Sequence, residues 1–203
     1  MPRTMIAVPC LDMVHTLFAA SLIELKKPEG TEIAMASCSL VYDARQDLAK
    51  RAINKGFDRI LWLDSDMIFK PDLLERLNAD MDQGRDFVSG LYFTRKNPVT
   101  PCVYDVVEPR KRKNGEIYPA VKSFEEIPED IFEINGCGFG AVIISTALYR
   151  RCGDLPFFPR EGFGEDLSFC RRAREAGYTL YCDPSIKAGH IGLTIVNENQ
   201  WKG

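Results

Sequence analysis

The 203-residue chain lacks several features that mark whole classes of protein. No stretch reaches the roughly 20 apolar residues of a membrane-spanning helix. The first short apolar segment is soon interrupted by Asp12 and His15, so we expect neither a transmembrane segment nor a secretory signal. A net charge of −3 gives no overall attraction to nucleic acids or anionic membranes. Because 45% of the residues are hydrophobic and no repeat or low-complexity linker is visible, the composition predicts a globular protein.

The cysteines form no recognisable framework. There are seven of them, which is an odd number, and no two have C-x-x-C spacing. Several lie within apolar segments, which favours reduced, buried thiols over disulfides or a zinc site. We therefore expect a soluble, cytoplasmic protein (in the host cytoplasm if a phage encodes it), and weak homo-oligomerisation stays open.

Residues 1–90 contain an alternation of strand and helix patterns. We predict strands at 5–8, 32–37, 58–63 and 87–89, and helices at 11–25, from Asp43 to before Gly56, and from near Pro71. Asp43 is expected to be the N-cap of the second helix, with Gln46 as its capping-box partner. This order predicts an α/β fold with a Rossmann-like, doubly wound, mainly parallel sheet.

Residues 91–203 have a different pattern. Segments 102–107 and 117–121 flank Asn114-Gly115, a strong hairpin signal, which puts the basic run 110–113 near the tip. A strand at 143–144, a short helix through Leu148, a helix at 165–176 closed by Gly177, and strands at 178–182 and 185–190 follow. We predict one domain, 1–203, with a nucleotide-binding half (1–90) and a smaller mixed or antiparallel acceptor-side half (91–203). The basic run is expected to be solvated or to contact an anionic acceptor.

The most informative segment is Asp64-Ser65-Asp66. It directly follows the apolar run Ile60–Leu63, which is typical of a strand buried on both faces. Two carboxylates at the carboxyl end of such a strand lie where open α/β sheets bind ligands. Mg²⁺ or Mn²⁺ beside a substrate's phosphates would explain the pair. The alternative is that Asp64 caps the helix near Pro71, or that both acids are solvated.

Two further segments contain candidate functional residues. Glu165 and Asp166 follow Gly164 at a helix start, where one carboxylate could act as a general base, although both could simply be favourable first-turn residues. His190, flanked by glycines, is an acceptable Mn²⁺ ligand or an ordinary hydrogen-bonding residue. The run Asn135–Gly140 precedes a strand instead of following one, so it is not a dinucleotide-binding loop. Its Gly138, Phe139 and Gly140, together with Gly164, are expected to line a substrate pocket.

Together these segments resemble the GT-A glycosyltransferases, especially small bacterial and phage enzymes of the family-2-like type. The resemblance covers most of the chain. It rests on Ala44-Arg45-Gln46, Leu63-Asp64-Ser65-Asp66, Gly164-Glu165-Asp166 and His190. The Trp62–Met67 segment is also similar to the mannan-polymerase branch, whose members retain the anomeric configuration that family-2-like enzymes invert.

The resemblance implies a metal-dependent donor site. Asp66 would bind the metal at the donor diphosphate, Asp64 would support the metal or the ribose, and His190 would complete the site. The residues placed near the nucleotide are Pro9, Asp12, Asp43, Arg45 and Ser65. Asp166 would be the base of an inverting transfer, and Glu165 would position the acceptor.

The predicted function is therefore transfer of a sugar from a nucleotide-sugar donor, UDP favoured over GDP, to an acceptor hydroxyl with Mn²⁺ or Mg²⁺. The acceptor stays open among a glycan, a protein, a modified nucleic acid and a small molecule. A nucleotidyltransferase is less favoured because Ala7–Met13 contains no glycine, lysine or arginine for a triphosphate. A phosphatase using Asp64 lacks a hydroxyl residue in Met67–Phe69. A non-catalytic nucleotide-sugar or glycan-binding module is the third alternative.

Overall fold

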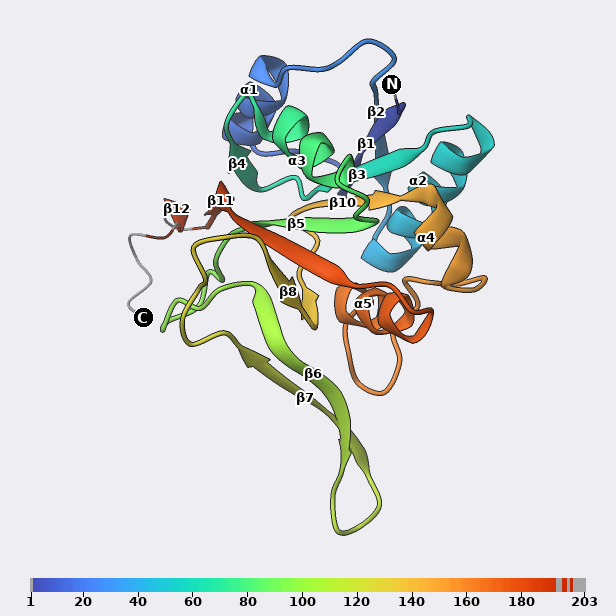
Figure 1. Ribbon diagram of the computed structural model, residues 1–203, viewed down its shortest axis with the longest axis vertical. Helices are drawn as coiled ribbons and strands as arrows, with labels where there is room; N and C mark the ends of the chain where they lie inside the picture. Colours follow the sequence, from blue (N-terminus) through green and yellow to red (C-terminus); the bar gives the residue numbers. More distant parts are fainter. Residues whose placement is uncertain (1, 193–194, 197, 199–203) are drawn as a thin grey trace.

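The computed structural model describes residues 2–192, 195–196 and 198; the remainder of the predicted 1–203 domain lies outside the described residues (Figure 1). Its helices are α1 (Thr16–Glu24), α2 (Val41–Asn54), α3 (Leu73–Met81), α4 (Thr146–Arg151) and α5 (Glu165–Glu175). Its strands are β1 (Thr4–Cys10), β2 (Glu32–Ser37), β3 (Arg59–Leu63), β4 (Met67–Phe69), β5 (Phe87–Leu91), β6 (Val103–Lys111), β7 (Ile117–Ser123), β8 (Phe132–Ile134), β9 (Gly136–Cys137), β10 (Ala141–Ser145), β11 (Leu180–Ile191) and β12 (Ile195–Val196).

A large mixed sheet forms the centre of the molecule. Within the described ranges it has nine strands, in the order β12-β11-β5-β10-β3-β1-β2, with β4 and β8 also paired to β11. Strands β2, β1, β3, β5 and β11 run in one direction, and β10 runs antiparallel between β3 and β5. This confirms the predicted mainly parallel α/β sheet.

Alternating strand residues supply two separate cores, because successive side chains point to opposite faces of a strand. Ile6 and Leu61 face α1 and α3, in a cluster with Phe18 and Leu74. Neighbouring residues such as Trp62 face α2, α4 and α5, in a cluster that also includes Leu48, Phe139, Phe157 and Phe169. Each fully buried side chain of this size contributes about 1.5–3 kcal/mol relative to an exposed one, so both layers of helices hold the sheet.

A second, three-stranded sheet, β7-β6-β9, is formed by later residues. Strands β6 and β7 form the predicted hairpin around Asn114-Gly115, and the ribbon projects away from the body of the molecule (Figure 1). This confirms the antiparallel part of residues 91–203. The proposed boundary at residue 90 stays a prediction, because the central sheet takes β8, β10 and β11 from beyond it.

Three predicted elements differ from those observed. Helix α2 begins at Val41 with Leu40 as N-cap, so Asp43 lies in its first turn and does not cap it. The Gln46 amide instead donates to the Asp154 carbonyl at 2.8 Å and accepts from Tyr149, which ties α2 to the α4 region. The segments 178–182 and 185–190 form one strand, β11.

The first helix starts at Thr16, later than predicted, with His15 as a side-chain N-cap. All seven cysteines are free, in agreement with the predicted reduced thiols. In the part of the chain that the structure describes, no helix combines the length and apolar character needed to cross a membrane.

Candidate functional site

A cleft of about 510 Å³ opens at the carboxyl ends of β1, β2 and β3. The predicted site residues that line it are Pro9, Arg45, Asp64, Ser65, Asp66, Gly138, Phe139, Glu165, Asp166 and His190. They come from segments separated by more than a hundred residues, and the fold brings them to one edge of the sheet. This is where ligands bind in open α/β sheets.

The tight turn between β3 and β4 presents the two aspartates. The Met67 N–H donates to the Asp64 carbonyl, and the Asp64 N–H donates to the Gly140 carbonyl at 3.3 Å. Both carboxylates stay about one-third exposed at the cleft. Asp64 therefore does not cap α3, whose N-cap is Asp72.

Arg45 holds two acids of the cleft together. Its Nη2 lies 2.9 Å from Asp64 Oδ1, and its Nε lies 3.4 Å from Glu165 Oε1. The guanidinium is 3% exposed and lies 5.3–6.0 Å from the ring centroids of Trp62, Phe139 and Phe157. Among the described residues its Nη1 has no hydrogen-bond partner, and the contact of the guanidinium with these rings favours the buried cation.

Charge decides the protonation of Arg45. Burial disfavours the guanidinium, but Asp64 and Glu165 outweigh it and raise the pKa of Arg45. Arg45 is consequently a fixed cation that couples α2, the aspartate turn and α5. Removing it would leave two partly buried carboxylates unpaired.

Asp66 has different partners. Its Oδ2 lies 2.8 Å from Arg95 Nη1 and 3.5 Å from His190 Nε2. Burial opposes ionisation of this carboxyl, but the hydrogen bond from His190 and the nearby charges of His190 and Arg95 lower the pKa of Asp66. Asp66 is thus an ionised carboxylate facing the cleft.

The fit to a divalent cation can be judged from these donors. Across the described residues, no group of three His, Cys, Asp or Glu side chains is close enough to form a metal cage. However, His190 Nδ1 donates to the Phe93 carbonyl at 3.0 Å, which turns Nε2 toward Asp66, 3.5 Å from its Oδ2. A bound metal would take the place of the proton that Nε2 shares with Asp66. One carboxylate and one such imidazole fit Mn²⁺ or Mg²⁺ that takes its remaining ligands from phosphate and water.

Asp166 is the most perturbed acid of the cleft. It lies in the first turn of α5, whose N-cap is Gly164, and its Oδ1 accepts from the Leu167 N–H at 2.7 Å. Burial, reinforced by the charge of Glu165, raises the pKa of Asp166 to about 7. A carboxyl that ionises near neutrality is suited to accept a proton from a substrate.

Four predicted site residues are not part of the cleft lining: Asp12, Asp43, Gly140 and Gly164. Asp12 and Asp43 are exposed, the latter because α2 starts before it. The Gly140 N–H donates to Tyr92 Oη at 3.0 Å, so this glycine positions a side chain that lines the cleft. Gly138 is required for packing, because a Cβ there would meet Tyr92 Oη at 2.1 Å.

Several lining residues were missed in the sequence. Tyr92, Arg95 and Cys102 lie between β5 and β6, and Tyr104 belongs to β6. Cys38 and Ser39 border the cleft from the loop between β2 and α2, and Val41 borders it as the first residue of α2. These three residues could have been found in the sequence, because they follow the carboxyl end of the predicted strand 32–37, as Asp64 follows the strand before it.

Comparison with known proteins gives a fold. No protein-family model and no curated protein sequence matches the chain. Among solved structures, A197 from STIV is similar with a TM-score of 0.70 at 22% identity, covering 94% of this chain and 86% of that one. GalNAc-T7, solved with UDP, GalNAc and Mn²⁺, is similar with a TM-score of 0.64 at 12% identity. TarS residues 1–349 from S. aureus give a TM-score of 0.53 at 14% identity.

GalNAc-T7 and TarS are glycosyltransferases, and the fold that this chain shares with them is the GT-A fold. The alignments cover 95% and 90% of this chain but only 44% of the GalNAc-T7 chain and 60% of the TarS chain. At these identities the likeness establishes the architecture alone. The activity has to be argued from the cleft.

Proposed function

We propose that this protein is a divalent-metal-dependent glycosyltransferase. It transfers a sugar from a nucleotide-sugar donor, with UDP favoured, to an acceptor hydroxyl with inversion of the anomeric centre. The observation that carries this proposal is the meeting of Asp66, His190 and Asp166 in one cleft from three separate elements. A cleft of about 510 Å³ is within the range for small-molecule sites.

The donor side combines metal ligands with an apolar mouth. Asp66 and His190 Nε2 would hold Mn²⁺ or Mg²⁺ beside the diphosphate, and Asp64, fixed by Arg45, would orient the ion or the ribose. Pro9 and Val41 border the cleft at the ends of β1 and the β2–α2 loop, a suitable place for the nucleoside. The choice of UDP and Mn²⁺ is supported by the solved complex of GalNAc-T7 with both.

The acceptor side uses Asp166 as the base. Its carboxylate takes the proton of the acceptor hydroxyl while the oxygen attacks the anomeric carbon, and the bond from that carbon to the diphosphate oxygen breaks with its electron pair. The bound metal supplies neutralisation of the charge that develops on the leaving diphosphate. Glu165 is held by Arg45, so it shapes the acceptor side and leaves proton transfer to Asp166.

The first experiment is a thermal-shift panel of UDP, GDP, CDP, dTDP and their sugar conjugates, each with Mn²⁺ and with EDTA. A ligand that binds only the folded state raises its apparent stability. We expect a shift with uridine nucleotides that requires Mn²⁺ and is lost in Asp66→Ala. Unchanged Mn²⁺-dependent UDP binding by Asp66→Ala would refute the metal assignment.

Turnover separates an enzyme from a binding module. Incubation of the protein with the stabilising UDP-sugar, Mn²⁺ and candidate acceptors should release UDP, and NMR of the product should show the inverted anomer. Asp166→Asn should keep the thermal shift but lose turnover. A product with retained configuration would contradict the base role of Asp166.

A further inference from the structure

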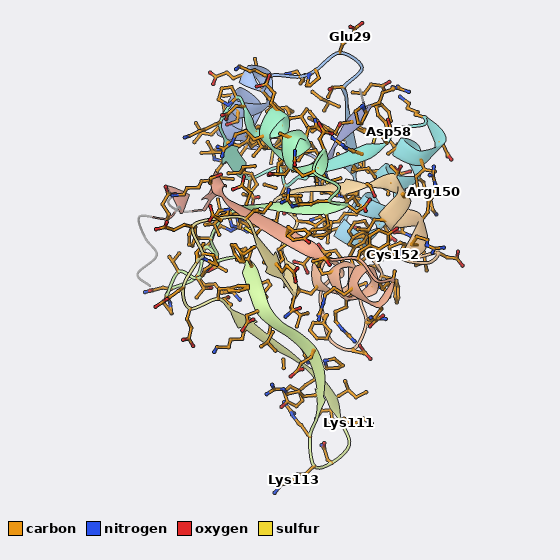
Figure 2. All side chains as sticks on the ribbon, in the orientation of Figure 1. Glu29, Asp58, Lys111, Lys113, Arg150 and Cys152 are labelled. Atoms are coloured by element: carbon orange, nitrogen blue, oxygen red, sulfur yellow. The ribbon has the colours of Figure 1, made fainter. Side chains whose placement is uncertain are left out.

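The β6–β7 ribbon is unexplained by the cleft alone. Its outer residues 108–117 are exposed and pack against no core cluster, yet the two strands stay paired out to Lys111 and Ile117. In Figure 2 Lys113 lies at the outermost end of the molecule, with Lys111 just behind it. An extended ribbon without a core has little stability of its own, so its projection calls for a partner.

The base of this ribbon belongs to the cleft. Tyr104 of β6 lines it, and β6 pairs with β9, which immediately precedes Gly138. The seven-residue rise from Tyr104 to Lys111 corresponds to about 23 Å at the usual strand spacing. A partner that touches both the tip and the cleft must therefore be a macromolecule.

The charges at the tip of the ribbon indicate an anionic partner. Arg110 is paired with Glu108 and Arg112 with Glu116, each at 3.0 Å or less. Among the described residues neither Lys111 nor Lys113 forms an ion pair, so both ammonium groups are available. The whole chain has a net charge of −3, so these two ammonium groups stand against an overall negative charge.

The unpaired cations lie at the end of the ribbon. Lys111 is the last paired residue of β6, opposite Ile117, and Lys113 lies in the turn beyond it. A narrow ribbon with unpaired cations at its tip suits a groove whose walls are anionic. The major groove of B-form DNA admits a two-stranded β-ribbon and has phosphates along both walls.

We propose that the β6–β7 hairpin docks duplex DNA by entering its major groove, and that the acceptor hydroxyl is carried by a modified base of that duplex, because ordinary duplex DNA has no free hydroxyl between its strand ends. The docking is argued from the ribbon alone, whereas the identity of the duplex as acceptor rests on the proposed function. Lys111 and Lys113 make the phosphate contacts. The deep, narrow major groove of A-form RNA does not admit such an element, so DNA is preferred over double-stranded RNA.

Fluorescence anisotropy with a short labelled DNA duplex tests this over a salt series. The double variant Lys111→Gln/Lys113→Gln should bind more weakly and reduce the salt slope by about 1 for each lost phosphate contact. The control Lys50→Gln/Lys70→Gln removes the same charge from exposed positions on the body and should bind as the wild type. Both variants should keep the Mn²⁺-dependent UDP shift.

Three results would overturn the proposal. These are no binding of duplex DNA by the wild type at low salt, equal losses in the tip and body variants, and equal affinity for DNA, for an RNA duplex of the same length and for heparin. None of them touches the UDP and Mn²⁺ measurement, so this failure is distinguishable from that of the glycosyltransferase assignment.

Discussion

At the scale of single residues, one carboxylate oxygen is shared by two basic side chains of the cleft. Asp66 Oδ2 contacts both Arg95 and His190, and Arg95 Nη1 also donates to the Ile191 carbonyl at 3.0 Å. The proposed metal would bind the same carboxylate. Arg95 and the metal therefore compete for Asp66, and the half-exposed Arg95 side chain is free to turn to a phosphate, which its planar fork binds well.

We expect Arg95→Gln to have opposite effects on two ligands. Mn²⁺ alone should bind more tightly, because a competing cation is gone. UDP in saturating Mn²⁺ should bind at least about tenfold more weakly, as expected for loss of a hydrogen bond to a charged group. Isothermal titration calorimetry measures both, with Lys96→Gln as an exposed neighbouring control. Equal affinities of Arg95→Gln and wild type for both ligands would exclude a movement of Arg95 from Asp66 to a phosphate.

Asp166 gives a prediction about pH. Since its pKa is about 7 in the folded protein, the carboxylate needed as base is half formed at that pH and falls about tenfold for each unit below it. With saturating donor, kcat should rise with pH and level off above about pH 8. A flat profile between pH 6 and 8 in a chemistry-limited assay would contradict the base role.

The same shift fixes the sign of a stability effect. A folded-state pKa above the ordinary 3.8 means that the folded protein holds this proton longer than the unfolded chain does. The contribution of Asp166 is therefore most favourable below about pH 4 and is lost as pH rises toward 7. We therefore expect the free energy of unfolding in urea, measured for Asp166→Asn relative to wild type, to be more favourable at pH 8 than at pH 4.

Much of the cleft could be predicted from residue patterns. Asp64 and Asp66 follow an apolar strand, so their place at its carboxyl end was accessible from the sequence. Arg95 was not, because it belongs to an irregular segment whose approach to β4 and β11 depends on the whole fold. Asp43 was wrongly predicted to be the N-cap of α2, because it matches a capping pattern. The helix starts earlier, and this start buries Arg45 and Gln46, both under 9% exposed.

At the scale of elements, packing determines the bounds of strands that the local sequence pattern leaves ambiguous. The sequence pattern predicted two strands, at 178–182 and 185–190, yet β11 continues through Pro184 between them because its register with β5 shifts between Asp183 and Lys187. Such irregularities accommodate a residue that cannot donate to the ladder. Short β4 was also missed, since three residues carry too little periodicity to distinguish a strand from a loop.

At the scale of the whole molecule, the central sheet is assembled from distant segments. Strand β10 inserts between β3 and β5, and within the described chain β5 pairs only with β10 and β11. The chain alternation of residues 1–90 gave no hint of this insertion, because antiparallel β10 comes from sequence that follows the hairpin. Strands from residues 1–90 and strands from the later residues share one sheet, so neither part has a complete core alone.

This interleaving predicts that the halves cannot fold separately. A fragment of residues 1–90 leaves β5 without a neighbour and exposes Trp62, which packs against Phe139 and Phe157 in the intact protein. We expect the fragment to show no cooperative unfolding in urea and an amide NMR spectrum with little chemical-shift dispersion. The full chain should unfold in one transition. Adding residues 91–203 as a second chain should restore dispersion. A well-dispersed spectrum from the fragment alone would mean that the first half is an independent domain, with β10 and β11 added to a sheet that is already stable.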